Sequence, residues 1–232
     1  MTVRASPPSL EEDVAYEPPP DIGLDLIHVD DDLVVVNKPA GLLSVPGRGA
    51  DRADCMAARV QARFSDAMIV HRLDMATSGL LVFGRGLAMQ RALSEAFAAR
   101  AVDKRYEAVV QGCVPNDAGD IDLPLITDWP RRPRQVVCFE RGKPSLTRYR
   151  VLSRSADEVS TRLSLEPVTG RSHQLRVHLL ALGHPIVGDP LYGPQVADGG
   201  QACERMCLHA VSLSLTHPRE GRVQTWVSPA PF

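Results

Sequence analysis

Apolar residues recur along most of the chain at the spacing of short β-strands. Leu26–Val29 and Leu33–Asn37 alternate or run apolar on either side of the acidic turn Asp30–Asp32, which predicts two strands joined as a hairpin. The same patterns predict seven further strands, at Met68–Val70, Leu80–Phe83, Tyr106–Gln111, Thr147–Leu152, Thr161–Glu166, Cys207–Leu215 and Arg222–Val227.

Three segments have helical spacing instead. Cys55–Phe64 and the Ala- and Leu-rich segment Leu87–Arg100 predict two helices, and Ser172 is a suitable N-cap for a third, from His173 to Leu182, that stops at Gly183. Many strands, few helices and no regular βαβ alternation indicate an α+β domain built on a mixed, largely antiparallel sheet flanked by a few helices.

The N-terminal segment differs from the rest. Residues 1–22 are rich in Pro and acidic residues and cannot bury apolar surface, so we expect a disordered tail there and a folded domain over residues 23–232. No run approaches the roughly 18 apolar residues that a membrane helix needs. Five cysteines, an odd number, indicate reduced thiols and a cytoplasmic protein.

The net charge of −2 conceals an uneven distribution. Residues 1–32 carry one Arg and nine acidic residues, so the remaining 200 residues have a net charge of +6. Seven basic residues lie between Arg131 and Arg150 with only Glu140 among them, and the arginines at 131, 132 and 134 are candidates for binding a polyanion. A solvated basic loop explains the same residues equally well.

Two polar segments interrupt the apolar pattern. His71-Arg72-Leu73-Asp74-Met75-Ala76-Thr77-Ser78-Gly79 lies between two apolar strands, where a scaffold commonly presents functional groups, although Asp74 could merely cap a turn. Thr169-Gly170-Arg171-Ser172-His173-Gln174-Leu175-Arg176-Val177-His178 crowds basic side chains onto a helix start. Arg171 and Arg176 project from different sides, so one can face a buried acid while the other stays near solvent.

These segments resemble the ordered motifs of the RluA family of pseudouridine synthases. The resemblance also includes Val36-Asn37-Lys38-Pro39-Ala40-Gly41-Leu42, Lys104-Arg105-Tyr106-Glu107-Ala108 and Gly183-His184-Pro185-Ile186-Val187-Gly188-Asp189, and it extends from about Leu26 to the C-terminus. Several motifs in the right order are far more specific than any one of them. The likeness is greatest to short members that act on both ribosomal RNA and tRNA.

The resemblance implies an RNA-modifying isomerase that uses no cofactor or metal. Specific uridines in stem-loops of large-subunit ribosomal RNA, of the tRNA anticodon arm, or of both would be converted to pseudouridine by residues 23–232 acting as the catalytic domain. Many relatives carry an N-terminal RNA-binding domain, and the first twenty-odd residues here are too few and too acidic to form one. We expect a monomer with an RNA substrate and no membrane partner.

The family's functional residues can be carried over position by position. Asp74 matches its obligatory aspartate, Arg176 the ion-pair partner of that aspartate, and Tyr106 the aromatic residue that stacks on the flipped uracil. Arg72 matches the side chain that enters the gap left by the base, and we expect Arg171 and His173 to contribute to RNA binding. A buried Asp74 would need a fixed guanidinium to stay ionised.

Other interpretations remain open at this stage. Cys203, Cys207 and His209, or His173 and His178, could hold a metal, although neither set has the spacing of common zinc sites. Asp74 with Glu107 or Glu166 could form the carboxylate pair of a glycoside hydrolase, but that leaves the arginines unexplained. A catalytically silent RNA-binding or RNA-remodelling module of the same fold is the third alternative.

Overall fold

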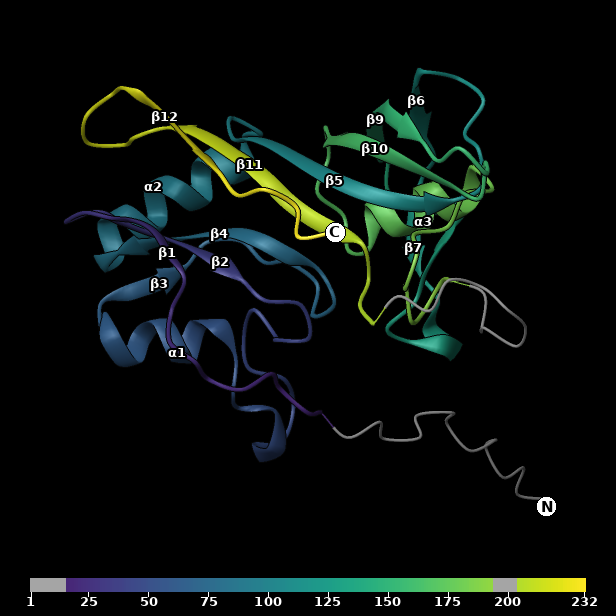
Figure 1. The fold of residues 1–232 in the computed structure, drawn as a ribbon. Helices are drawn as coiled ribbons and strands as arrows, with labels where there is room; N and C mark the ends of the chain where they lie inside the picture. Colours follow the sequence, from purple (N-terminus) through teal and green to yellow (C-terminus); the bar gives the residue numbers. More distant parts are fainter. Residues whose placement is uncertain (1–15, 194–203) are drawn as a thin grey trace, which may run out of the picture.

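The computed structural model describes residues 16–193 and 204–232. Their central feature is a sheet of ten strands in the order β1-β2-β4-β11-β5-β10-β9-β6, with β12 added beside β11 and β3 beside β4 (Figure 1). Its strands are β1 Leu26–Val29, β2 Leu33–Lys38, β3 Ala67–Ile69, β4 Ser78–Arg85, β5 Asp103–Gln111, β6 Ala118–Asp122, β9 Leu146–Arg154, β10 Ser160–Pro167, β11 Leu208–Thr216 and β12 Val223–Val227.

The strand pairing is antiparallel throughout this sheet except between β4 and β11. Three α-helices flank it, and the described chain is therefore the predicted mixed, largely antiparallel α+β domain. The helices are α1 Met56–Arg63, α2 Gly86–Ala98 and α3 Gln174–Ala181, and two 3₁₀ turns, η1 Ala50–Arg52 and η2 Trp129–Arg131, lie in the connections.

The apolar runs form strands that are buried on both faces. Along β2, Val34 and Val36 belong to one cluster of buried side chains, and Leu33 and Val35 belong to another on the opposite face. The residues of β4 divide between the same two clusters. Helix α1 packs in the first cluster and α2 in the second, so both faces of this half of the sheet are covered. Its strands therefore have continuous apolar runs instead of alternating apolar and polar residues.

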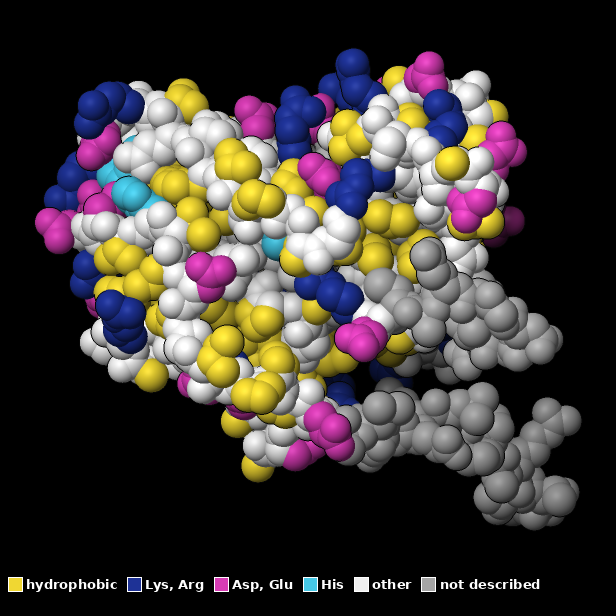
Figure 2. Space-filling model, in the orientation of Figure 1, with side chains coloured by type: hydrophobic (Ala, Val, Ile, Leu, Met, Phe, Trp, Pro, Cys, Tyr) yellow, Lys and Arg dark blue, Asp and Glu magenta, His cyan; other side chains and the backbone are white. Residues whose placement is uncertain are grey.

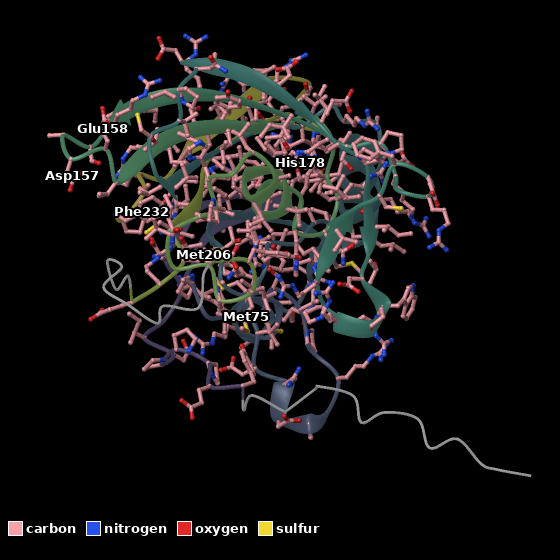
Figure 3. The ribbon with its side chains drawn as sticks, turned by 90° about the vertical axis from the view of Figure 1, so that its right-hand side faces the viewer. Met75, Asp157, Glu158, His178, Met206 and Phe232 are labelled. Atoms are coloured by element: carbon pink, nitrogen blue, oxygen red, sulfur yellow. The ribbon has the colours of Figure 1, made fainter. Side chains whose placement is uncertain are left out.

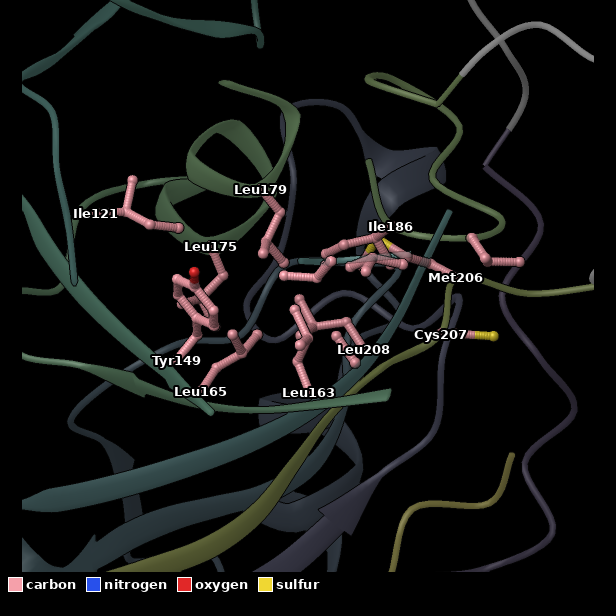
Figure 4. Close-up of a cluster of buried hydrophobic side chains, with 14 residues drawn as sticks. Ile121, Tyr149, Leu163, Leu165, Leu175, Leu179, Ile186, Met206, Cys207 and Leu208 are labelled. Atoms are coloured by element: carbon pink, nitrogen blue, oxygen red, sulfur yellow. The ribbon is translucent and has the colours of Figure 1, made fainter. Parts of the chain in front are cut away.

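A second core fills the other half of the molecule. Apolar side chains of β5, β9 and β10 pack against Leu175 and Leu179 of α3 and against Ile186 and Leu208 (Figure 4). The long strands β5 and β11 run between the two halves (Figure 1). Tyr106, on β5, packs against clusters from both halves and thus lies at their junction.

The sequence pattern did not reveal the strands of residues 112–145. β6 belongs to the main sheet, whereas β7 Leu125–Thr127 and β8 Gln135–Val137 form a separate two-stranded sheet. The segment 123–145, called here the basic hairpin, includes these last two strands and packs against α3. Each of its strands has three residues, too few for a periodicity to be recognised.

Two local predictions need correction. The N-cap of α3 is His173, in the left-handed conformation with φ of 53°, and not Ser172. The side chain of Gln174 organises this turn instead, because its Oε1 accepts hydrogen bonds from the Thr169 hydroxyl at 2.6 Å and the Arg171 amide at 3.0 Å.

The second correction concerns the N-terminal segment, of which residues 1–15 lie outside the described residues. The expectation of a mobile tail does not hold for residues 16–22. The Tyr16 hydroxyl donates to the Asp54 carbonyl and accepts from the Leu43 amide, both at 3.0 Å. Arg59 of α1 donates to the Pro19 carbonyl at 2.6 Å. A proline-rich segment buries little apolar surface, but its carbonyl groups are still available to a fixed arginine.

Candidate active site

Asp74 lies in the loop between β3 and β4, and the backbone on each side of it is fixed by hydrogen bonds. The buried Ser44 hydroxyl donates to the Leu73 carbonyl at 2.7 Å and accepts from the Leu73 amide at 3.0 Å. The Thr77 amide donates to the Asp74 carbonyl at 3.1 Å. The loop then enters β4 at Gly79, whose φ of 114° and contact with the Ala210 backbone leave no room for a Cβ.

Lys38 holds the same loop from beneath. Its side chain is fully buried, and its ammonium group donates to the carbonyls of Pro39 at 2.9 Å, Leu42 at 2.7 Å and Met75 at 3.1 Å. Burial lowers the pKa of Lys38 to about 7, against the opposing effect of the Asp74 carboxylate. The loop that carries Asp74 is therefore fastened to the end of β2 by a buried amine. Figure 3 labels Met75 in this loop.

Arg176, on α3, connects Asp74 to a second carboxylate. Its Nε and Nη2 atoms donate to the two oxygens of Asp189, each at 2.7 Å, and its Nη1 atom lies 3.4 Å from Asp74 Oδ2. Asp189 is fully buried and also accepts hydrogen bonds from the amides of Leu191 and Tyr192. Burial by itself would raise the pKa of Asp189, but the hydrogen bonds from Arg176 outweigh it and the pKa is lowered.

His173 and Tyr192 complete the surroundings of Asp74. The Nε2 atom of His173 lies 3.9 Å from Asp74 Oδ1, and its Nδ1 atom is 2.7 Å from the Tyr192 hydroxyl. Burial lowers the pKa of His173. The Tyr192 hydroxyl also accepts from the Gln135 amide at 2.7 Å, and its ring lies beneath the guanidinium of Arg176 at 5.0 Å. Tyr192 therefore joins the basic hairpin to the residues that position Asp74.

Tyr106 faces the same space from β5. Burial, reinforced by the charge of Asp74, raises the pKa of the Tyr106 hydroxyl, so the phenol stays protonated at neutral pH. A neutral aromatic ring beside a carboxylate can stack on a nucleobase without repelling it. The stacking of Tyr106 on the flipped uracil, which its match to the family implies, stays a prediction.

A cleft of about 520 Å³ lies between the two halves of the sheet, and its lining includes Asp74, Tyr106, His173 and Arg176. Six of the nine predicted site residues lie on its wall: Arg72, Asp74, Tyr106, Arg171, His173 and Arg176. Asp74 is the one acidic residue among the described residues that line it. As expected, Arg176 is buried and faces acidic groups, whereas Arg171 is exposed.

The other three predicted residues lie on the basic hairpin, outside this cleft. Arg131 forms an ion pair with Asp128 at 2.7 Å, Arg132 stacks on the exposed ring of Trp129, and Arg134 lies over the Tyr192 ring at 5.2 Å. Arg131 and Arg134 help to line a smaller cavity of about 150 Å³ between the hairpin and α3. The hairpin thus meets the site through Tyr192 and through the Pro144 carbonyl, to which Arg171 donates at 3.4 Å.

Sequence reasoning missed several residues that the structure places at or beneath the site. They are Lys38, Arg100, Lys104, Asp189 and Tyr192. Lys38 could have been suspected because it is a charged residue at the end of an otherwise apolar strand. Lys104 could have been found from its position two residues before Tyr106, since alternate residues of a strand share a face.

The alternative chemistries are not supported by the described residues. Glu107 pairs with Arg162 at 2.9 Å and Glu166 lies 3.5 Å from Arg148, and neither lines the cleft, so the carboxylate pair of a hydrolase is not formed with Asp74. No group of three potential metal ligands occurs in residues 16–193 and 204–232. Cys203, part of one candidate metal set, lies outside them. None of the helices in the described part of the chain is long and apolar enough to cross a membrane.

Comparison with known proteins settles the family. The family described as RNA pseudouridylate synthase matches residues 32–181, which include Asp74, Tyr106 and Arg176. The chain belongs to the RNA pseudouridylate synthase family. This enzyme forms pseudouridine from uridine in RNA, so the alternative of a catalytically silent module is set aside.

Curated relatives match nearly the whole chain. It is 48% identical over 215 residues to the dual-specificity RNA pseudouridine synthase RluA of Pasteurella multocida, with 93% of this chain and 95% of the relative covered. Identity to the enzyme of the same name from Escherichia coli K12 is also 48%, covering 94% and 98%. The solved structure of human RNA Pseudouridylate Synthase Domain Containing 1 superposes with a TM-score of 0.77, 31% identity, and 93% and 87% of the two chains covered.

Proposed function

We propose that Asp74 is the catalytic residue of the isomerisation. The observation that carries this is its position as the one acidic side chain among the described lining residues, on a loop fixed by Ser44 and Lys38. The reaction breaks the bond between uracil N1 and ribose C1′ and joins C5 to C1′. The C5 proton is lost and N1 takes up a proton. An ionised carboxylate can attack C1′ or accept a proton from the sugar, and both roles require the charge that Arg176 stabilises.

The neighbouring side chains fit the steps before that chemistry. Uracil inside a stacked loop is out of reach, so the base must be extruded at a cost of a few kcal/mol. Stacking on Tyr106, worth about 1–3 kcal/mol, would offset part of that cost. Arg72 is exposed beside Asp74 and can enter the gap that the base leaves. Arg171 and His173, which also line the cleft, would contact the RNA.

We propose uridines in stem-loops of both large-subunit ribosomal RNA and the tRNA anticodon arm as the substrates. The support is the likeness over almost their full length to enzymes named as dual-specificity. Single-stranded loops suit such a cleft, because their bases can splay out and stack on a protein ring. The arginines at 131, 132 and 134 would add electrostatic affinity for the stem. We also propose that the enzyme is a monomer and that it acts in the cytoplasm.

The deciding experiment measures tritium release from C5-labelled stem-loops of each RNA with native protein and with Asp74→Asn. The substitution keeps the size of the side chain and removes its charge, so we expect turnover to be lost and RNA affinity to stay within about threefold. Asp157→Asn is the matched control, because Asp157 is exposed in the β9–β10 turn (Figure 3). Appreciable turnover by Asp74→Asn would remove Asp74 from catalysis, and an inert tRNA stem-loop would restrict the enzyme to ribosomal RNA.

A further inference from the structure

The charge of the cleft exceeds what the catalytic residues require. Five cations line it, namely Arg72, Arg100, Lys104, Arg171 and Arg176, against the single carboxylate of Asp74. Within the described part of the chain, Arg176 alone among these five pairs with a carboxylate. Elsewhere, cations and acids adjoin, and Figure 2 shows Lys and Arg side chains beside Asp and Glu side chains on the face that it draws. Arg105 and Arg148, for example, lie 3.9 Å and 3.5 Å from Glu166. The cleft therefore carries an excess of positive charge.

Lys104 is the most informative of these cations, because it is partly buried. Its side chain leaves the same face of β5 as Tyr106, and the two residues start about 6.6 Å apart along the strand. Its ammonium lies 6.0 Å from the centre of the Phe97 ring and close to the Gly170 backbone. Burial lowers the pKa of Lys104. An interaction with one ring at that distance compensates little for the reduced hydration, so the site favours an anion beside the ammonium.

Arg100 stands at the same end of the cleft, just beyond α2. It is exposed and has a φ of 59°, in the left-handed region where glycine is the usual residue after a helix. Its backbone conformation therefore does not explain the presence of a large cationic side chain. Arg100 and Lys104 are therefore two cations near the position where the base would stack on Tyr106.

The chemistry of a uridine nucleotide identifies the anion. Uracil is uncharged at neutral pH, so the nearest negative groups to an extruded base are the two phosphates that flank its ribose. We propose that Lys104 and Arg100 bind one of these flanking phosphates while the base occupies the space beside Tyr106 and Asp74. This inference rests on the proposed function of the cleft. It assigns the part of the cleft beside Lys104 and Arg100 to the RNA backbone and the space beside Tyr106 and Asp74 to the reacting ribose and base.

The test combines protein variants with single neutral phosphates. Stem-loop substrates carry one methylphosphonate linkage, on the 5′ side or the 3′ side of the target uridine or three linkages away, and tritium release gives kcat and KM. We expect Lys104→Gln to lower kcat/KM about tenfold, mainly through KM, and Arg100→Gly to lower it severalfold without straining the backbone. One flanking methylphosphonate should lower kcat/KM of the native enzyme about tenfold and that of Lys104→Gln less than twofold.

Two controls keep the outcomes distinct. Arg91→Gln changes an exposed cation of α2 outside the cleft and should behave as the native enzyme on every substrate. Lys104→Arg keeps the charge and should retain the methylphosphonate penalty even if Lys104→Gln folds poorly. If the loss of kcat/KM caused by Lys104→Gln and the loss caused by the methylphosphonate multiply at both flanking linkages, the phosphate site is overturned and the proposed function stays intact. Absence of tritium release from every unmodified stem-loop would instead overturn the proposed function.

Discussion

Arg176 donates its two short hydrogen bonds to Asp189 and makes only a 3.4 Å contact with Asp74. Asp189 is fully buried, whereas the Asp74 side chain is 22% exposed. The guanidinium is therefore oriented by Asp189 and offers a remaining nitrogen to Asp74. The carboxylate proposed to react is the less tightly held of the two, and it remains accessible from the cleft.

The first prediction follows from this asymmetry. Arg176→Met should lower the free energy of unfolding by about 3–5 kcal/mol, because it leaves the buried Asp189 carboxylate without its partner. Adding Asp189→Asn should restore part of that stability, and adding Asp74→Asn should restore much less, because water can reach Asp74. Urea unfolding of the single and double variants measures both. Equal rescue by the two Asn substitutions would mean that Asp189 is not the principal partner of Arg176.

A second prediction concerns the pH dependence set by Lys38. Because its pKa is about 7 in the folded protein and about 10.5 in the unfolded chain, unfolding takes up a proton between these values. The contribution of Lys38 to stability is thus complete above about pH 10.5 and is lost as the pH falls to about 7. The stability difference between native protein and Lys38→Met should shift in favour of the native protein as the pH rises from 7 to 9.

Chemical denaturation of both proteins at several pH values checks this, because the other ionising groups cancel in the difference. A difference that does not change with pH would mean that the buried amine keeps its charge, held by its three carbonyl partners. The same substitution should also slow turnover, since it removes the hydrogen bond to Met75 beside Asp74.

The basic hairpin should act on RNA affinity and not on chemistry. Changing Arg131, Arg132 and Arg134 together to Gln should weaken stem-loop binding and flatten the slope of log affinity against log salt by about 0.7–0.9 for each phosphate that the variant no longer neutralises. Single-turnover rates at saturating RNA should change little. Arg63, Arg91 and Arg222 are exposed cations that provide a matched triple variant. An unchanged salt slope would identify the hairpin arginines as a solvated surface.

A pair of truncations tests the N-terminal segment. Deleting residues 1–15 should leave the melting temperature and kcat/KM unchanged, or raise the association rate slightly, because three acidic residues and one Arg are removed. Deleting residues 1–21 should lower the melting temperature. The hydrogen bonds that join the Tyr16 hydroxyl to the Leu43 amide and the Asp54 carbonyl are then lost, and Arg59 no longer has the Pro19 carbonyl as an acceptor. Equal melting temperatures for the two truncations would show that these hydrogen bonds add nothing to stability.

The sequence alone determined most of the strands, the three helices and much of the site. Strands such as β2 and β4, and helix α2, follow from local hydrophobic pattern and propensity, which depend only on neighbouring residues. The motifs around Asp74, Tyr106 and Arg176 identified the family and the residues that the fold then brings to one cleft. Such motifs are visible because each is continuous in the chain.

The tertiary structure decided what those residues contact. Asp189, 13 residues from Arg176, is the main partner of Arg176, and Lys38 supports the Asp74 loop through Met75, 37 residues away. A local sequence pattern does not predict contacts over such separations. Lys104 and Arg100 line the cleft because β5 and the end of α2 meet there. Contacts of this kind depend on how strands pair and helices pack, and those are set by burial of the whole core and not by any one segment.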